Sequence, residues 1–282
     1  MIIRISDDFD HGKIAESGQC FRWERTETGW RVPHAERCLL IEPAGEGEYR
    51  LDCTEADFQA VWRGYFDLGE NYERIRARID PGADPFLWAV AERQKGLRIL
   101  RQDPWEVLVS FILSQNKNIP AIRRCVRLLT EACGEKKRDS SGKTFFAFPG
   151  PEAILSIGAE GLAGCAAGYR AKYVLAAAQA ALDGRFCPEA LMEAGEEETM
   201  AALTALFGVG RKVASCVSLF GLHHLNAFPR DVWINRILER EYPGGYPFGA
   251  YSPYNGVFQQ YMFAYYPSLV RPPRGKTPGG GA

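Results

Sequence analysis

The hydrophobic pattern of the chain changes character near Thr54. Before it, short alternating runs such as residues 49–53 (YRLDC) are separated by turn signals, including TETG and GEGE. Alternation with a period of two is typical of strands joined by hairpins. After Thr54, which is an expected N-cap, Phe58, Trp62 and Tyr65 recur at helical spacing. The pattern therefore predicts an α+β protein with an N-terminal antiparallel β-sheet domain.

Helical patterns fill most of the remaining chain. Two helices are expected to begin after Asp84 and Asp103, because each aspartate is followed by a proline. The second, PWEVLVSFILSQ, is apolar almost all round and indicates a central buried helix. The polar stretch CGEKKRDSSGKT is expected to be a loop. We expect three parts: an N-terminal β-sheet domain over 1–103, an all-α domain over 104–270 and a disordered tail over 271–282.

The charge balance excludes a protein that coats DNA through charge alone. The 34 Lys and Arg residues nearly equal the 35 Asp and Glu residues, which gives a net charge of −1. The distribution is uneven, however. Residues 1–57 hold 13 acidic and 7 basic residues, whereas residues 115–145 hold 8 basic and 3 acidic residues. A local basic stretch suits contact with phosphates, so we expect any DNA binding to depend on salt.

The sequence also bears on location. It has no run of about 18 apolar residues, and its N-terminus turns acidic where a secretory signal would be basic and then apolar. We therefore expect no membrane partner and a cytoplasmic location. The eight cysteines form no CxxC pair, which favours packed thiols over disulfides or zinc ligands in a reducing compartment.

Two glycines spaced by one residue join two helical segments at Leu206-Phe207-Gly208-Val209-Gly210. Such a turn lets backbone amides point outward at the start of the second helix. Together with the helix dipole, these amides form a site suited to a DNA phosphate. A helix–helix turn with glycines only for steric reasons is the alternative.

Lys212 lies in the first turn of the second helix, where the helix dipole opposes a cation and favours the neutral amine. The neutral amine is the nucleophile in Schiff-base chemistry. Cys216 follows one turn later on the same face, and Asp231 precedes an amphipathic helix as an expected N-cap. Taken alone, an exposed surface lysine and a buried core thiol are the commoner roles for Lys212 and Cys216, while a simple N-cap at Asp231 is compatible with a role in a site.

These features resemble one family. Residues 206–212 followed by Asp231 are similar to the hairpin, lysine and aspartate of the helix-hairpin-helix (HhH-GPD) DNA glycosylase superfamily. More specifically, the chain resembles the 8-oxoguanine DNA glycosylase/AP lyase family. The further matching segments are residues 17–23 (SGQCFRW), 99–104 (ILRQDP), 110–112 (SFI), Asn116, 168–173 (GYRAKY) and 256–263 (GVFQQYMF). They cover nearly the whole chain in the family's order.

The resemblance implies roles for two catalytic residues. Lys212 is expected to attack C1′ of the damaged nucleotide, expel the base and form a covalent imine with the sugar. Asp231 is expected to position and stabilise the sugar cation that develops. A β-elimination then cuts the strand on the 3′ side. Both roles fit a dipole-tuned amine beside a capped carboxylate.

The resemblance also implies a pocket for the base, which a glycosylase extrudes from the helix. The Gly18 carbonyl is expected to accept the N7 hydrogen peculiar to 8-oxoguanine. Gln259 reads the base edge, while Phe263 and Cys216 stack on its two faces. The implied pocket residues are Gly18, Phe111, Cys216, Gln259 and Phe263.

Contacts to the rest of the DNA follow from the same resemblance. Asn116 is expected to fill the gap left by the flipped base, and Arg170 to hold the orphaned cytosine. The hairpin residues Gly208, Val209 and Gly210 are expected to contact the DNA backbone.

The chain departs from the family at several positions. Ala121 stands where a second cytosine-contacting arginine is expected, so the sequence predicts a relaxed choice of opposite base. Trp233 replaces a phosphate-contacting histidine, Phe207 replaces the usual hairpin proline, and Ala264 follows Phe263 where a carboxylate is expected near the pocket.

The expected partner is double-stranded DNA containing 8-oxoguanine, bound by a monomer. No cysteine follows Cys216, which excludes the four-cysteine iron–sulfur cluster of some related glycosylases. We expect no cofactor and no metal site, while a monovalent or calcium ion at the hairpin stays open. The alternatives are a non-catalytic helix-hairpin-helix DNA-binding module, a glycosylase for another damaged base and a small-molecule lyase.

Overall fold

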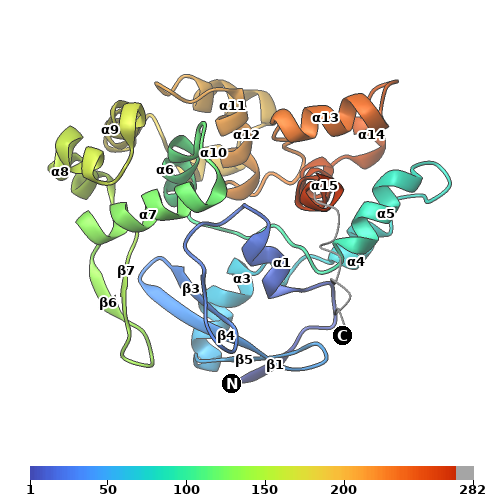
Figure 1. Ribbon diagram of the computed structural model, residues 1–282, viewed down its shortest axis with the longest axis horizontal. Coiled ribbons are helices and arrows are strands. Elements are labelled where there is room, and N and C mark those ends of the chain that lie inside the picture. Colours follow the sequence, from blue (N-terminus) through green and yellow to red (C-terminus); the bar gives the residue numbers. More distant parts are fainter. Residues whose placement is uncertain (271–282) are drawn as a thin grey trace, which may run out of the picture.

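The computed structural model describes residues 1–270. Its N-terminal part contains a five-stranded sheet of order β1-β5-β4-β3-β2, in which every neighbouring pair is antiparallel. The predicted antiparallel sheet is confirmed, and it lies below the helices in Figure 1. The strands are β1 (Ile2–Arg4), β2 (Glu24–Arg25), β3 (Trp30–His34), β4 (Arg37–Gly45) and β5 (Glu48–Leu51).

Helices surround this sheet and continue to the end of the described chain. The first group is α1 (His11–Glu16), α2 (Glu55–Asp57), η1 (Phe58–Trp62), α3 (Arg63–Tyr65), α4 (Tyr72–Arg76) and α5 (Pro85–Arg93). The second group is α6 (Pro104–Ser114), α7 (Ile119–Cys133), α8 (Pro151–Gly164), η2 (Gly168–Arg170), α9 (Ala171–Leu182), α10 (Pro188–Glu193), α11 (Glu196–Thr204), α12 (Arg211–Phe220), α13 (Val232–Glu241), α14 (Phe248–Tyr251) and α15 (Asn255–Val270).

The helix starts expected from the sequence are confirmed. The side chains of Thr54, Asp84 and Asp103 each accept a hydrogen bond from a backbone N–H in the first turn that follows. These bonds satisfy amides that have no partner inside the helix. Helix α6 is buried from Val107 to Ser114, so it is the central helix that its apolar sequence predicts.

The stretch after α7 corrects one expectation. It is not a loop but a two-stranded hairpin of β6 (Lys136–Arg138) and β7 (Thr144–Phe146), so the helical part is not all-α. Asp139 organises the turn, because its Oδ1 accepts from the Ser141 and Lys143 amides. Its Oδ2 pairs with Arg31 of the sheet at 2.6 Å. The hairpin is therefore stabilised by a contact with a strand that is distant in the sequence. The polar sequence of the hairpin itself gives no sign of this contact.

Helix α8 is interrupted at Gly158, whose φ of +59° and ψ of −164° are not helical, so two helical segments meet at a kink there. Glycine at the kink allows the change of direction, because a positive φ is strained for other residues.

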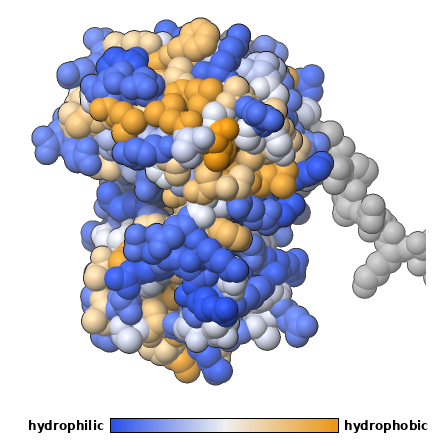
Figure 2. Space-filling view, turned by 90° about the vertical axis from the view of Figure 1, so that its left-hand side faces the viewer, coloured by the Kyte–Doolittle hydropathy of each residue, from blue (hydrophilic) through white to orange (hydrophobic). Residues whose placement is uncertain are grey.

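One continuous core extends from the sheet into the helices, with Trp62, Tyr72 and Phe258 among its largest buried side chains. Helix α5 packs on α15, so a helix from the first third of the chain lies beside the last described helix (Figure 1). Figure 2 shows that the molecule narrows between its upper and lower halves, and that apolar side chains gather on the upper half. Within residues 1–270 no helix is long and apolar enough to cross a membrane. The tail predicted to be disordered, 271–282, lies outside the described residues.

Candidate active site

The turn before α12 has the geometry that its two glycines predict. Gly208 has a φ of +85°, and a Cβ added there would lie 2.2 Å from Cγ of Tyr173, so only glycine fits. The Val209 N–H donates to the Leu206 carbonyl at 3.0 Å. Gly210 then precedes α12 without a side-chain cap. The first amides of α12 are left for an external acceptor, as phosphate binding requires.

Lys212 is the second residue of α12 and its side chain is exposed. Its Nζ lies over the Phe111 ring, 5.0 Å from the ring centroid. Phe111 comes from α6 and is buried between two other rings, stacking on Phe220 and meeting Phe21 edge-on. The central helix thus supplies an aromatic support for the amine.

Cys216 links the two expected catalytic residues. It follows Lys212 by one helical turn and is only 2% exposed. Burial raises the pKa of the Cys216 thiol, the neighbouring Lys212 ammonium opposes this rise, and the Asp231 carboxylate adds to it. The buried Cys216 thiol therefore lies within electrostatic range of both Lys212 and Asp231.

Asp231 is held rigidly as the N-cap of α13. Its Oδ1 accepts hydrogen bonds from the Trp233 and Ile234 amides at 2.9 and 2.8 Å. Oδ1 accepts both cap hydrogen bonds, which fixes the orientation of the carboxylate. Oδ2 takes no part in the cap. This cap is compatible with stabilising positive charge on a bound sugar.

The expected base pocket brings together two distant segments. Gly18 has a φ of +81°, and a Cβ added to it would lie 3.2 Å from Cε1 of Phe263 and 3.4 Å from Cδ1 of Ile119. Phe263 lies on α15, one turn after Gln259. The backbone of the Gly18 loop therefore lies against the ring that is expected to stack on the base.

Gln259 is 3% exposed, and its Oε1 has no hydrogen-bond partner among the described residues. A buried amide oxygen without a partner is costly, which suits a group that pairs with a ligand. Gly256 lets α15 approach α12 closely, because a Cβ there would lie 2.5 Å from Cδ1 of Leu219. This contact brings the helix of Gln259 beside the helix of Cys216.

The residues expected to contact the DNA opposite the base also converge. Asn116, at a φ of +52°, follows α6 and donates through Nδ2 to the Tyr169 hydroxyl at 3.0 Å. Gln115 donates to the Gly208 carbonyl at 3.0 Å. The loop of Asn116, the segment of Tyr169 and the hairpin turn therefore form one continuous surface.

Arg170 belongs to this surface but points inward. It is 6% exposed, and its guanidinium donates to the carbonyls of Gln115 and Ala167 while lying 4.4 Å from the Tyr169 ring centroid. In this arrangement it braces the loop of Asn116. Its expected role in holding a cytosine stays a prediction.

This arrangement of hairpin, lysine and aspartate can be compared with known proteins. Residues 2–108 match the family model described as the N-terminal domain of 8-oxoguanine DNA glycosylase. Residues 109–244 match the model of the HhH-GPD superfamily base excision DNA repair protein. The chain belongs to the 8-oxoguanine DNA glycosylase family.

Individual members of the family and solved structures agree with this assignment. The N-glycosylase/DNA lyase of Saccharomyces cerevisiae is 36% identical over 254 residues, which cover 81% of this chain and 67% of the yeast protein. The structure of MBOgg1 in complex with a low-affinity DNA ligand has a TM-score of 0.89 and 35% identity, and covers 96% of both chains. The 8-oxoguanine glycosylase/lyase of Clostridium acetobutylicum, in complex with double-stranded DNA containing cytosine opposite to 8-oxoG, has a TM-score of 0.85 and 30% identity over 96% of this chain and 99% of that one.

Several supporting residues of this family member were missed from the sequence. Gln260 donates to the Ser17 carbonyl at 2.8 Å. The Gln19 side chain donates to the Arg98 carbonyl and accepts from the Leu100 amide, and the Gln19 carbonyl accepts from the Gln102 side chain. Both hold the loop of Gly18. Tyr169 and Gln115 hold the loop of Asn116. Each lies beside a predicted site residue, which is the only signal that the sequence offers.

The departures from the family pattern lie on or near the same surface. Ala121 is the third residue of α7, and its amide bonds to the N-cap Asn118 at 3.0 Å. Phe207 is 60% exposed beside Tyr173. Trp233 is also exposed, with the Arg236 guanidinium 4.9 Å from its ring centroid. Aromatic rings thus occupy positions where the family pattern has proline and histidine.

Proposed function

We propose that this chain removes 8-oxoguanine from duplex DNA and then cuts the strand through a Schiff base at Lys212. The Lys212 amine over the Phe111 ring, at the start of the helix that follows the hairpin turn, carries this proposal. The Asp231 carboxylate, held as the N-cap of the next helix, supports it. The kinship with N-glycosylase/DNA lyases supports a catalytic enzyme over a non-catalytic binding module.

The reaction begins with the neutral Lys212 amine attacking C1′ of the damaged nucleotide. The N-glycosidic bond breaks, its electron pair leaves with the base, and the base takes up a proton as the amine loses one. The Asp231 carboxylate stabilises positive charge on the sugar as this bond breaks. Opening of the sugar ring then gives an imine between Lys212 and C1′.

The imine prepares the strand for cleavage. It makes the C2′ hydrogen acidic, so a proton leaves C2′ while the bond from C3′ to the phosphate breaks. The phosphate departs with the electron pair as the 5′ end of the downstream fragment. Water then hydrolyses the imine and restores the Lys212 amine.

The base is read in the pocket of Gly18, Cys216, Gln259 and Phe263. The Gly18 carbonyl accepts the N7–H that 8-oxoguanine has and guanine lacks. The unpartnered Gln259 Oε1 supports a polar contact to the base edge. The Phe111 ring packs against the Lys212 amine. Asn116 and the hairpin glycines contact the DNA around the lesion.

We propose no resident cofactor for these steps, since each uses groups of the chain, the DNA or water. Within residues 1–270 no three His, Cys, Asp or Glu side chains come together as a metal-binding group. An ion at the hairpin carbonyls stays a prediction, and its site would not take part in the chemistry.

A trapping experiment tests the proposal. The protein is incubated with a duplex containing 8-oxoguanine opposite cytosine in the presence of borohydride, which reduces the imine to a stable amine. We expect a covalent protein–DNA complex with the wild-type chain and none with Lys212→Gln. Binding of the duplex without trapping by the wild type would favour the non-catalytic module.

A further inference from the structure

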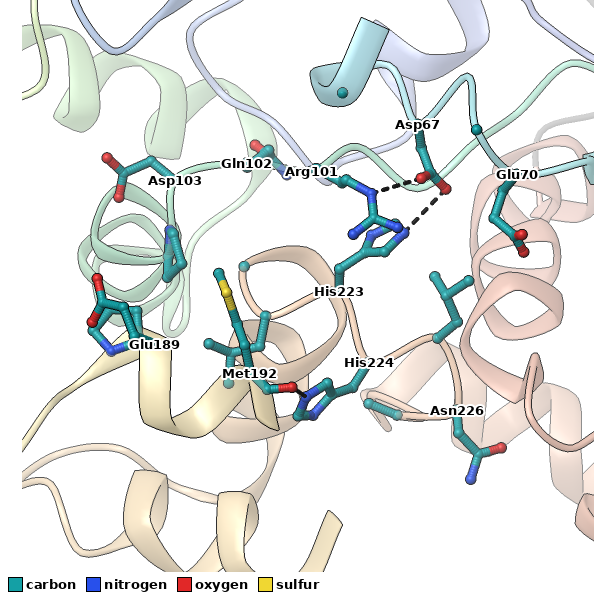
Figure 3. A pocket seen from close by; sticks show the side chains of 18 of the residues that line it. Asp67, Glu70, Arg101, Gln102, Asp103, Glu189, Met192, His223, His224 and Asn226 are labelled. Atoms are coloured by element: carbon teal, nitrogen blue, oxygen red, sulfur yellow. Dashed lines mark hydrogen bonds and ion pairs between the residues drawn. The ribbon is translucent and has the colours of Figure 1, made fainter. Parts of the chain in front are cut away.

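A large groove lies at the opposite end of α12 from Lys212. It has a volume of about 1420 Å³, and both halves of the molecule line it. One wall is the segment after α3, with Asp67 and Glu70, and the other is the loop after α12, with His223 and His224 (Figure 3). The loop from 221 to 230 joins the helix of Lys212 to Asp231, so this groove borders the connection between the catalytic residues.

A hydrogen bond joins the side chains of Asp67 and His223, which come from opposite walls of the groove. His223 Nε2 lies 3.0 Å from Asp67 Oδ2, and the two side chains are only 7% and 2% exposed (Figure 3). His223 Nδ1 is buried without a partner among the described residues, so this bond alone fixes the ring direction. Burial opposes ionisation, but the His223 and Arg101 contacts hold the pKa of Asp67 below its ordinary value.

Both residues have an unusual backbone. Asp67 has a φ of +52° and His223 a φ of +60°, in the left-handed region that residues other than glycine rarely adopt. Such conformations persist only where surrounding contacts hold them, and they cluster at functional sites. Here two residues with this backbone conformation, one from the N-terminal part and one from the helical part, are joined to each other by their side chains.

From Asp67 the contacts lead to the loop of Gly18. Asp67 Oδ1 pairs with Arg101 Nε at 2.7 Å. The next residue, Gln102, donates to the Gln19 carbonyl at 2.9 Å. The Leu100 amide donates to Gln19 Oε1 at 2.8 Å. The segment from 98 to 102 thus connects the carboxylate of Asp67 to the residue next to Gly18.

From His223 the contacts lead to the residues that act on the sugar and the base. The loop that carries His223 continues from α12 and ends at Asp231. The Leu225 carbonyl in this loop accepts from the Gly256 amide at 2.8 Å, which fixes the start of α15, the helix of Gln259 and Phe263. Among residues 1–270, neighbouring His224 bonds only within the helical half, to Ser218 and Met192.

We infer that Asp67 and His223 are a positioning pair, which fixes the position of the loop of Gly18 relative to the helices that carry the other pocket residues. The inference rests on the proposed function. Recognition of 8-oxoguanine uses Gly18 from the N-terminal part of the molecule and Cys216, Gln259 and Phe263 from the helical part. It therefore depends on the relative position of these two parts. Cleaving a strand that already lacks its base needs Lys212 and Asp231, which both lie in the helical half.

This division gives a test with two substrates. His223→Asn keeps a residue that tolerates the left-handed backbone but is too short to reach Asp67. We expect it to lower kcat/KM for excision of 8-oxoguanine by about ten- to hundredfold, and cleavage at a preformed abasic site by less than about threefold. Asp67→Gly should do the same, and the double variant should be no worse than either single variant.

Two controls separate positioning from folding. Asp67→Asn keeps the hydrogen-bonding shape and should restore most of the excision that Asp67→Gly loses. His224→Asn changes the neighbouring histidine in the same loop and should leave the ratio of the two activities unchanged. Equal losses on both substrates, or wild-type excision in His223→Asn, would overturn the inference. A wild-type chain that excises no 8-oxoguanine would instead overturn the proposed function.

Discussion

The backbone of Gly18 lies directly against the ring of Phe263, although the two residues come from opposite ends of the chain. A Cβ at position 18 would lie 3.2 Å from Cε1 of that ring. The glycine is therefore required twice, by its φ of +81° and by the neighbouring ring. This contact is where the N-terminal part meets the helix that completes the expected base pocket.

Substitution of Gly18 tests this contact. Gly18→Ala should lower excision of 8-oxoguanine by about tenfold or more, because the loop must shift away from the base. Cleavage at an abasic site should change little. Single-turnover rates on the two duplexes measure both effects. Gly184→Ala is the matched control, since Gly184 has a φ of +72° with no atom within 4 Å of its added Cβ. A similar loss of excision in both variants would show that backbone strain alone is responsible.

Replacement of the catalytic carboxylate should separate chemistry from stability. Asp231→Asn retains an oxygen for the Trp233 and Ile234 amides, so the free energy of unfolding should fall by less than about 0.5 kcal/mol. Loss of the negative charge should lower base excision by about 10²- to 10³-fold while duplex binding persists. Asp103→Asn alters an N-cap of α6 that likewise accepts from the amides two and three residues later, and it should leave excision unchanged. Full activity in Asp231→Asn would remove this residue from the mechanism.

The opposite base should be chosen loosely. Ala121 offers no guanidinium, and the loss of one bidentate contact removes about 1–3 kcal/mol of discrimination between bases. Excision rates with C, A, G or T opposite the lesion measure this preference. We expect Ala121→Arg to increase the advantage of C over the other three. A wild-type enzyme that acts only opposite C would refute this prediction.

The buried pair of Arg31 and Asp139 should govern acid stability. Both side chains are 6% exposed. Arg31 also pairs with Glu24 at 3.0 Å, so Asp139→Ala removes one of its two carboxylate partners and should cost about 1.5–3 kcal/mol of unfolding free energy at pH 7. Burial raises the pKa of Asp139, but hydrogen bonds from Ser141 and Arg31 outweigh this effect and lower it below the ordinary value. Its stabilising contribution is therefore complete above the ordinary aspartate pKa and is lost as the pH falls through the lowered one.

Urea unfolding curves at pH 7 and at about pH 3 check this prediction, because the ordinary aspartate pKa is near 3.9. The difference between wild type and Asp139→Ala should shrink at the lower pH. Asp183→Ala is a suitable control, since Asp183 pairs with Arg185 on the exposed surface. A difference that does not depend on pH would show that Asp139 acts through packing alone.

Much of the local structure follows from the sequence. Thr54, Asp84, Asp103 and Asp231 all cap the helices that they precede, because a short polar side chain before a helical pattern satisfies free amides. The hairpin before Lys212 was expected from its two glycines alone. These features depend on neighbours in the sequence, and neighbouring residues restrict each other's backbone directly.

Other features depend on residues that are far apart in the chain. The β6–β7 hairpin was predicted as a loop, because its polar sequence gives no sign of the Arg31 that pairs with Asp139. The inward direction of Arg170, the bond between Asp67 and His223 and the second glutamine at 260 were likewise not predicted. Each is decided by which segments pack together.

The sequence by itself determined that an antiparallel β-rich part precedes the helices, and it determined the hairpin with its lysine and the aspartate cap. Only the tertiary structure decided the strand order, the β6–β7 hairpin and the contacts that hold the N-terminal part against the helical part. The physical reason is the range of the interactions. Backbone preferences and caps act over a few residues, whereas burial, ion pairs and close glycine contacts join segments whose meeting no local pattern encodes.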